Sequence, residues 1–406
     1  MKKDRYRKQL FQMCGIGFAI VIVAACFLQR RINDSSWEDA SGTSAGWAEN
    51  SKELGLLSVD EINADRLSEQ TIQISWPDSL DAEAEQYIVK KRRIINPNEA
   101  ETWCIVDTVS SDHQVDGNLW QVTDRLADTT IQQYEYTVDV QVRDASKYEP
   151  QKGRCVLASN LLVCIDPGHY NGVNRLDGGY VEGDVTLQLA LMLRDDLKRK
   201  YGIDSCLTRE TGSITLNGYT DEVLDSAHLE LRGLYAGEMG CDIFLSLHTN
   251  ANETNANGFE TCSQPIAINK PILIVNTTTC TSQTAIKVAN EIGTSLSAVN
   301  YEMGLSTVME FRTVTFGQVD QWTDAYNDSL DMPGTVFCKF MNDGRDYYGV
   351  LRGAACVGVP GIIIEHGMHT VPEVRTASTE GDLIERWAAA DAYGIAQGFG
   401  FTSQGE

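Results

Sequence analysis

The sequence predicts an α/β fold in which a twisted, mostly parallel sheet is flanked by helices, preceded by a small β-sandwich domain and a membrane-anchor helix. Three observations support this prediction. An uncharged apolar stretch occupies 10–28. Between 57 and 155, apolar and polar residues alternate, which is typical of half-buried strands. From 160 onward, short continuous apolar runs alternate with amphipathic helical patterns, which indicates a layered α/β domain.

The bulk composition limits the possible partners. The chain has 406 residues, 42% of them hydrophobic and 22% charged, which is enough for two or three domains with cores of their own. Its formal net charge is −24 at pH 7. Proteins that bind nucleic acid need basic patches to neutralise phosphates, so we expect no nucleic-acid partner.

The N-terminus carries the features of a membrane anchor. Basic residues crowd positions 1–9, and Arg30 and Arg31 follow the apolar stretch. A helix over this stretch is just long enough to cross a hydrocarbon core of about 30 Å. The greater positive charge before it predicts a cytoplasmic tail, with the bulk of the chain on the outer, cell-wall side. Residues 1–32 are therefore interpreted as a tail and a single-pass signal anchor; a cleaved signal and lipid attachment at Cys26 are the alternatives.

A linker and a β domain follow. Residues 33–56 are rich in Ser, Asp, Glu, Gly and Ala and read as a flexible spacer. In 57–155, Ile72, Ile74 and Trp76 alternate with polar residues, and further runs begin near Tyr87 and Tyr134. The spaced aromatics of Ile-Ser-Trp, Tyr-Ile-Val and Tyr-Glu-Tyr-Thr-Val resemble a fibronectin type III domain, which implies a small β-sandwich.

Polar side chains follow three buried strands of the domain predicted at 160–402. The run that begins at Leu161 ends in Asp-Pro-Gly-His169, a second run ends in His248, and Ile-Ile-Ile precedes Glu365. Ligand sites of open α/β sheets lie at the carboxyl ends of the strands. Glu182 opens a helix after a Gly-rich loop and is expected to point back toward His169.

These residue types predict a catalytic zinc site. Two histidines and one glutamate form a known zinc set that leaves a coordination position open. His169, Glu182 and His248 are the expected ligands, with Asp177 and Asp184 as substitutes for Glu182. Glu365 is suited to move protons beside the metal.

An ordered set of motifs resembles the peptidoglycan amidases that cleave N-acetylmuramoyl-L-alanine bonds. The set covers about 60% of the chain, at 160–400. It consists of Ile-Asp-Pro-Gly-His at 165–169, Glu182, Leu-Thr-Arg at 207–209, Arg232, Asp-Ile-Phe-Leu-Ser-Leu-His-Thr-Asn-Ala at 242–251, Gly-Phe-Glu at 258–260, Tyr-Gly-Val-Leu-Arg at 348–352 and Ile-Ile-Ile-Glu-His-Gly at 362–367.

The resemblance implies an autolysin-type cell-wall hydrolase with one Zn²⁺ per chain, held by His169, Glu182 and His248. It implies that Glu365 is the catalytic acid and base, and that the partner is peptidoglycan, recognised through its stem peptide and N-acetylmuramic acid. Four residues are expected to bind substrate: Arg232, Asn250, Leu351 and Arg352. An activator protein is left open, and residues 300–347 look like an insertion that could cover the cleft.

Several alternatives stay open at this point. A related zinc enzyme could cut within the stem peptide, or the chain could be a non-catalytic wall-binding regulator. Arg232 could be a fold-supporting ion-pair residue, and Leu351 and Arg352 could simply pack on the surface. His366 and His369, close to Glu365, are expected to support the site from behind.

The eleven cysteines show no metal-ligand spacing such as CxxC. Nine follow the N-terminal apolar stretch, so they cannot all pair with one another. Segments such as Val163-Cys164-Ile165 and Gly240-Cys241-Asp242-Ile243 predict small core residues in strands. One or two disulfides remain open.

Overall fold

The computed structural model describes residues 54–112, 118–251, 269–278, 282–306, 309–322 and 333–404. The predicted anchor, most of the linker and the Gly-Phe-Glu motif at 258–260 lie outside these residues. Within them, none of the helices is both long enough and apolar enough to span a membrane.

The N-terminal part of the described chain is built of strands, as predicted. They are β1 (Gly55–Leu57), β2 (Asn63–Ser68), β3 (Thr71–Pro77), β4 (Ala84–Asn96), β5 (Glu99–Ala100), β6 (Cys104–Ser110), β7 (Leu119–Arg125), β8 (Gln133–Val142), β9 (Tyr148–Pro150) and β10 (Cys155–Ser159). One antiparallel sheet has the order β2-β3-β7, and another has the order β10-β8-β4-β5, with β6 paired to β4. A short parallel pair joins β1 and β9.

Aromatic side chains form the core of this β domain. The predicted alternation is confirmed in β3, where Ile72, Ile74 and Trp76 are at most 1% exposed. Trp76 meets the ring of Tyr87 edge-on at 5.4 Å and stacks on Trp120 at 6.3 Å between ring centroids. Tyr136 is fully buried, and its hydroxyl donates a hydrogen bond to Asp124. Residues from both sheets therefore enclose one core.

The second part of the chain is an α/β domain. Its strands are β11 (Leu162–Pro167), β12 (Asp204–Leu207), β13 (Thr215–Leu216), β14 (Tyr219–Thr220), β15 (Ile243–Asn250), β16 (Ile272–Val275), β17 (Phe311–Arg312), β18 (Asp320–Gln321), β19 (Gly334–Cys338) and β20 (Gly361–Met368). Its helices are η1 (Asp177–Gly179), α2 (Glu182–Tyr201), α3 (Asp221–Ala227), α4 (Glu230–Glu238), α5 (Ser282–Glu302), η2 (Phe316–Gln318), α6 (Gly349–Cys356), α7 (Pro372–Glu380) and α8 (Leu383–Phe399).

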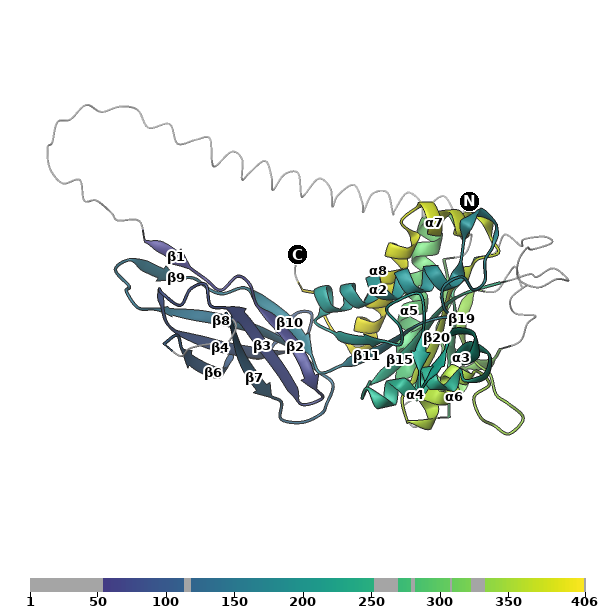
Figure 1. The fold of residues 1–406 in the computed structure, drawn as a ribbon, viewed down its shortest axis with the longest axis horizontal. Coiled ribbons are helices and arrows are strands. Elements are labelled where there is room, and N and C mark those ends of the chain that lie inside the picture. The colour runs from purple at the N-terminus through teal and green to yellow at the C-terminus, as the bar shows by residue number, and fades with distance from the viewer. Residues whose placement is uncertain are drawn as a thin grey trace, which may run out of the picture. The chain divides into compact units, whose positions relative to one another are not determined.

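The main sheet has the order β12-β11-β15-β20-β16-β19-β17, with β18 also paired to β19. Figure 1 labels β11, β15, β20 and β19 of this sheet. The described pairs are parallel except β16 with β20, which are antiparallel. The predicted mostly parallel sheet is therefore confirmed. The strand β20, late in the sequence, lies between β15 and β16, in the interior of the sheet.

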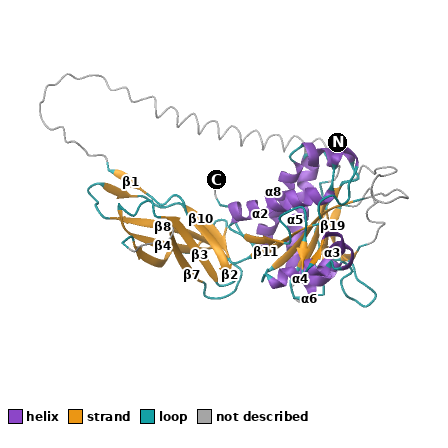
Figure 2. Cartoon of the chain, in the orientation of Figure 1, coloured by secondary structure: helices purple, strands orange, loops and turns teal. Residues whose placement is uncertain are grey.

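Helices flank this sheet, as the alternating pattern predicted (Figure 2). Helix α2 packs on β11, β12 and β15, and α5 on β16, β19 and β20, with α8 against both helices. Helices α4 and α6 pack on each other and on β15 and β20. In α2, the residues predicted to form the buried face, Val185, Leu189, Leu193 and Leu197, are all buried. Gly202 ends α2 in a left-handed conformation, with φ of 66°, where its N–H caps the last turn.

Candidate metal centre

Adjacent strands bring the predicted site residues to one edge of the sheet. Strand β11 is paired in parallel with β15, and β15 with β20. His169 follows the last residue of β11 by two positions, while His248 and Glu365 are register partners on β15 and β20. Glu182 is the first residue of α2. The structure therefore gathers residues that are far apart in the sequence at the strand ends where they were expected.

Two imidazoles and one carboxylate converge at this edge. One ligand atom each of His169, Glu182 and His248 lies within 4.8 Å of the others. Nδ1 of His248 is 3.3 Å from Oε1 of Glu182, and Nε2 of His169 is 3.6 Å from Oε2. The two rings stand nearly perpendicular, at 89°, with centroids 4.9 Å apart. Both histidine side chains keep partial exposure, at 27% and 18%, so the group is open to solvent on one side.

Glu182 is buried yet charged. It is 1% exposed, and its carboxylate accepts hydrogen bonds from the Thr249 backbone N–H at 3.0 Å and the Asn174 amide at 2.7 Å. Burial opposes ionisation, but the hydrogen bond from His248 and the charge of His169 outweigh it and lower the pKa of Glu182. The carboxylate is thus held in the anionic form that a cation needs.

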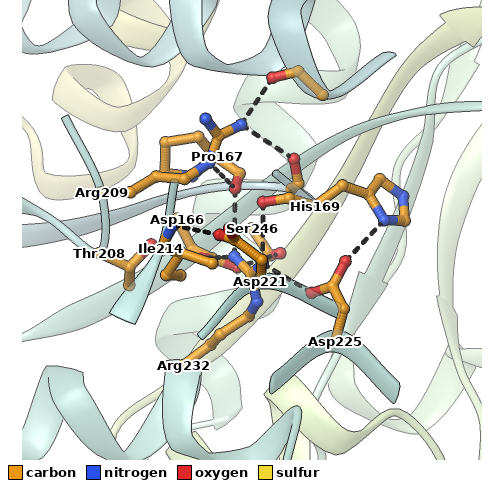
Figure 3. A network of polar contacts seen from close by, with 12 residues as sticks. Asp166, Pro167, His169, Thr208, Arg209, Ile214, Asp221, Asp225, Arg232 and Ser246 are labelled. Carbon is orange, nitrogen blue, oxygen red and sulfur yellow. Dashed lines mark hydrogen bonds and ion pairs between the residues drawn. The ribbon is translucent and has the colours of Figure 1, made fainter. Parts of the chain in front are cut away.

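His169 is oriented by a carboxylate behind it. Its backbone is left-handed, with φ of 61°, which turns the side chain away from the strand direction. Nδ1 of the ring lies 3.1 Å from Oδ2 of Asp225, on α3, and must donate because a carboxylate only accepts (Figure 3). In the neutral imidazole this tautomer leaves Nε2, which faces Glu182 at 3.6 Å, as the nitrogen whose lone pair is available to a metal. Carboxylate-backed histidines of this kind are common around metals.

A buried ion network supports the His169 loop (Figure 3). Arg232 is 1% exposed and donates to Asp166 and to Asp225, both at 2.7 Å, and to the His169 carbonyl at 2.8 Å. Asp166 also accepts from Thr208 and Ser246. The network ties β11, α3 and α4 together directly beneath His169.

A second arginine and a glycine fix the same loop. Arg209, 4% exposed, donates to the carbonyls of Pro167, Gly168 and Gly183, and so links the end of β11 to the start of α2. At Gly168, a Cβ atom would lie 2.4 Å from Cε1 of His248. Only glycine therefore lets the two histidine-bearing strands approach this closely.

Glu365 holds an oxygen without a partner. Its Oε2 atom is buried and makes no hydrogen bond to any residue that the structure describes. Burial, with a smaller contribution from the charge of Glu182, raises the pKa of Glu365 well above its ordinary value. A carboxyl group in such surroundings can exchange a proton with a substrate near neutral pH.

Two further histidines lie behind the centre. His366 is fully buried, and its ring nitrogens lie 2.9 Å from the His248 carbonyl and 2.7 Å from Oδ2 of Asp391. His369, 3% exposed, lies 3.0 Å from the Thr249 hydroxyl. Both side chains contact the strand that carries His248, in line with the supporting role expected for them.

The predicted substrate-binding residues lie in different environments. Arg232 is enclosed in the ion network. Leu351 is 1% exposed and packs in the core near Gly361, the first residue of β20, while Glu365 lies further along that strand. Arg352 is half-buried and donates to the carbonyls of Asp346 and Tyr347. Asn250 ends β15, two residues after His248, and its backbone carbonyl accepts a hydrogen bond from His369.

Asp225, Asn174 and Thr249 belong to the centre but were not predicted from the sequence. Asp225 lies on a helix of seven residues that has one buried apolar residue, so no periodic pattern distinguishes it. Thr249 binds Glu182 through its backbone N–H, which any residue type other than proline provides. Of the substitutes considered for Glu182, Asp184 instead accepts a hydrogen bond from the Gly172 N–H.

Comparison with known families gives one match within the chain. The Amidase_3 model, which describes N-acetylmuramoyl-L-alanine amidases, matches residues 163–397, more than half of the chain. This segment contains the four residues of the centre. No curated protein matches the chain.

Several solved structures are similar to the same part of the chain. The N-acetylmuramoyl-L-alanine amidase AmiC2 of Nostoc punctiforme has 20% identity and a TM-score of 0.38, over 58% of this chain and 96% of that one. The catalytic domain of CwlV, an N-acetylmuramoyl-L-alanine amidase from Bacillus (Paenibacillus) polymyxa var. colistinus, has 17% identity and a TM-score of 0.38. The match covers 58% of this chain and 97% of that one. Cwp6 from Clostridium difficile has 20% identity and a TM-score of 0.37, and the match spans 58% of this chain and 29% of Cwp6.

Proposed function

The chain belongs to the N-acetylmuramoyl-L-alanine amidase family, and from this premise we propose that His169, Glu182 and His248 hold one zinc ion while Glu365 transfers the protons. As a member of this family the chain is a cell-wall hydrolase that acts on the amide bond between N-acetylmuramic acid and L-alanine in peptidoglycan. The observation that carries the residue assignment is the convergence of three ligand atoms beside a buried, unpaired carboxylate oxygen.

The distances within the centre fit zinc. Nitrogen and oxygen ligands at about 2.0–2.1 Å from a tetrahedral ion lie about 3.3 Å apart. The separations of 3.3 Å between Nδ1 of His248 and Oε1 of Glu182, and of 3.6 Å between Nε2 of His169 and Oε2, are close to this value. When bound, zinc supplies Lewis-acid polarisation of a carbonyl and makes water more acidic.

The chain's own residues then divide the work. Asp225 keeps the proton of His169 on Nδ1, so that Nε2 stays available. The Thr249 N–H and the Asn174 amide hold the Glu182 carboxylate in place. Glu365, one strand away from His248, takes a proton from the attacking water and returns it to the leaving nitrogen of L-alanine.

Among the predicted substrate contacts, we favour Asn250 and Arg352 over Arg232 and Leu351. Asn250 ends the strand of His248, and Arg352 keeps part of its side chain exposed. Arg232 and Leu351 are each 1% exposed, so a fold-supporting role suits them better than contact with a stem peptide.

We also propose the wider organisation of the chain. Residues 1–32 anchor it in the cell membrane, with 33–56 as a spacer, so that the β domain at 57–155 and the catalytic domain at 160–402 lie on the cell-wall side. Lipid attachment at Cys26 is the minor alternative. The two antiparallel sheets around one aromatic core support a fibronectin type III-like sandwich for the β domain.

Mass spectrometry of fragments released from purified peptidoglycan tests this function. The enzyme should release stem peptides with a free L-alanine amino terminus, and a zinc chelator should stop the release. New amino termini within the stem peptide would instead identify a peptidase. Release of no fragments by a zinc-loaded chain would favour a wall-binding regulator.

A further inference from the structure

Three cysteines from separate parts of the sequence meet on the main sheet, away from the His169 centre. Cys164 lies on β11, Cys206 on β12, and Cys241 two residues before β15. Their Sγ atoms all lie within 4.8 Å of one another, and those of Cys206 and Cys241 are 3.3 Å apart. We propose that Cys164, Cys206 and Cys241 form a second metal site, in which three thiolates bind one Zn²⁺.

This cluster is distinct from the proposed catalytic centre. Cys164 and Cys206 are register partners in the middle of their strands. Cys164 is about 10 Å along β11 from Pro167, the last residue of that strand, and His169 lies beyond Pro167. Cys241 precedes its strand, whereas His248 lies near that strand's far end. The two groups of ligands therefore cannot share an ion.

The three cysteines are free thiols in the structure. The Sγ atoms of Cys206 and Cys241 are 3.3 Å apart, whereas a disulfide bond is about 2.05 Å long. Strand β11 lies between β12 and β15, so these two side chains approach each other across the strand that carries Cys164. The thiols therefore form a group of three and not one isolated pair.

The sulfur separations are close to those of a shared cation. Zn–S bonds of about 2.3 Å place the sulfurs of a tetrahedral site about 3.8 Å apart. The Sγ atoms of Cys206 and Cys241 are 3.3 Å apart, and Sγ of Cys164 lies within 4.8 Å of both. The three thiols are therefore near the spacing that one zinc ion requires.

The burial of the three cysteines and the chemistry of their thiols suit an ion that prefers sulfur ligands. Cys164 is fully buried and Cys241 is 7% exposed, while Cys206 is half-buried. The half-buried thiol of Cys206 gives an ion access from solvent, and water would complete its coordination. Thiolates select zinc or Cu(I) over hard cations such as Mg²⁺. An ion bound there would tie together β12, β11 and the start of β15, so its role would be structural.

Zinc stoichiometry of the full-length chain tests the proposal. After purification under reducing conditions and loading with Zn²⁺, elemental analysis should find two equivalents in the wild type. It should find one in Cys206→Ser, one in His248→Ala and none in the double variant. Cys206→Ser should keep wall hydrolysis, which His248→Ala should lose. If the catalytic assignment is wrong, His248→Ala should keep all of its zinc while Cys206→Ser still loses one equivalent. The two variants therefore test the two sites separately.

Two controls make the result specific. Cys338→Ser replaces another buried cysteine of the same sheet and should still bind two equivalents. Cadmium added to His248→Ala should give sulfur-to-metal charge-transfer absorption that is absent when Cys206 is also replaced.

If a serine variant does not fold, alkylation of the wild-type chain decides, because zinc should protect all three cysteines together. Equal zinc in wild type and Cys206→Ser, no protection by zinc, or a mapped disulfide within the trio would each overturn the proposal.

Discussion

His248 and Glu365 are register partners on adjacent parallel strands, β15 and β20. The relative position of the proposed zinc ligand and the proposed proton-transfer group is thus set by the pairing of two neighbouring strands and not by loops. Because backbone hydrogen bonds of a buried sheet hold such neighbours firmly, the distance between metal and acid is built into the fold.

Glu365→Gln should lose wall hydrolysis by about 10²–10⁴-fold, because the amide keeps the shape of the side chain but cannot exchange protons. Zinc content should stay at the wild-type level, since Glu365 is not a ligand. His248→Ala should lose both zinc and activity, and Glu373→Gln, at an exposed position on α7, should change neither. Activity of Glu365→Gln close to that of the wild type would refute the assignment.

Asp225→Asn should weaken zinc binding or activity by about 10–100-fold, because it removes the charge that orients His169. Zinc affinity measured by competition with a chelating dye gives the direct readout. Glu222→Gln, an exposed change on the same helix, serves as the matched control. Equal affinities for both variants would show that Asp225 does not act through His169.

Arg232→Met should lower the free energy of unfolding by about 3–5 kcal/mol, since it leaves the buried Asp166 and the partly buried Asp225 without their cation. Urea unfolding of the variant measures this loss. Arg386→Met, which breaks an exposed ion pair with Asp382, should change stability by no more than about 1 kcal/mol. A stable Arg232→Met chain with a raised KM would restore the substrate-binding interpretation.

Gly168→Ala should reduce activity by about a hundredfold, because the new methyl group displaces the His248 ring and the Leu247 carbonyl. Gly317→Ala has open space around the added atom and should be neutral. Comparing wall hydrolysis with zinc content shows whether the ligand itself has moved. An active, fully loaded Gly168→Ala chain would contradict the close approach described at this position.

Alkaline pH should destabilise the β domain. Burial, with smaller contributions from the charge and hydrogen bond of Asp124, raises the pKa of Tyr136 above its ordinary value. The folded state therefore keeps a proton that the unfolded state releases above about pH 10, and stability falls by about 1.4 kcal/mol per pH unit there. Tyr136→Phe should flatten this slope between about pH 9 and 11, whereas Tyr393→Phe, at an exposed position, should not. Identical slopes in urea unfolding would exclude Tyr136 as the cause.

The sequence predicted those parts of the fold whose signals are local. Continuous apolar runs located β11, β15 and β20, and the residues after them proved to share one sheet edge. The regular spacing of leucines located α2, and Glu182 does begin it. The alternation around Ile72 and Trp76 located β3. In each case the way in which one segment is buried is visible in the pattern of apolar residues within that segment.

Other features depend on contacts between distant segments and left no such pattern. The five residues of β19 pair with β16 and β17, but they lie within the stretch at 300–347 that resembled an insertion. Asp225 meets His169 only because α3 packs behind the loop. The cysteine cluster unites three positions that each looked like ordinary core, since sequence spacing carries no record of which strands become neighbours.

The position of β20 also has a consequence for the order of assembly. All three proposed zinc ligands lie on β11, β15 and the segments between them, whereas Glu365 arrives on a strand that must insert between β15 and β16. Closing that connection requires contacts across more than a hundred residues of chain, which form slowly. We therefore expect the three proposed zinc ligands to come together during folding before Glu365 joins them.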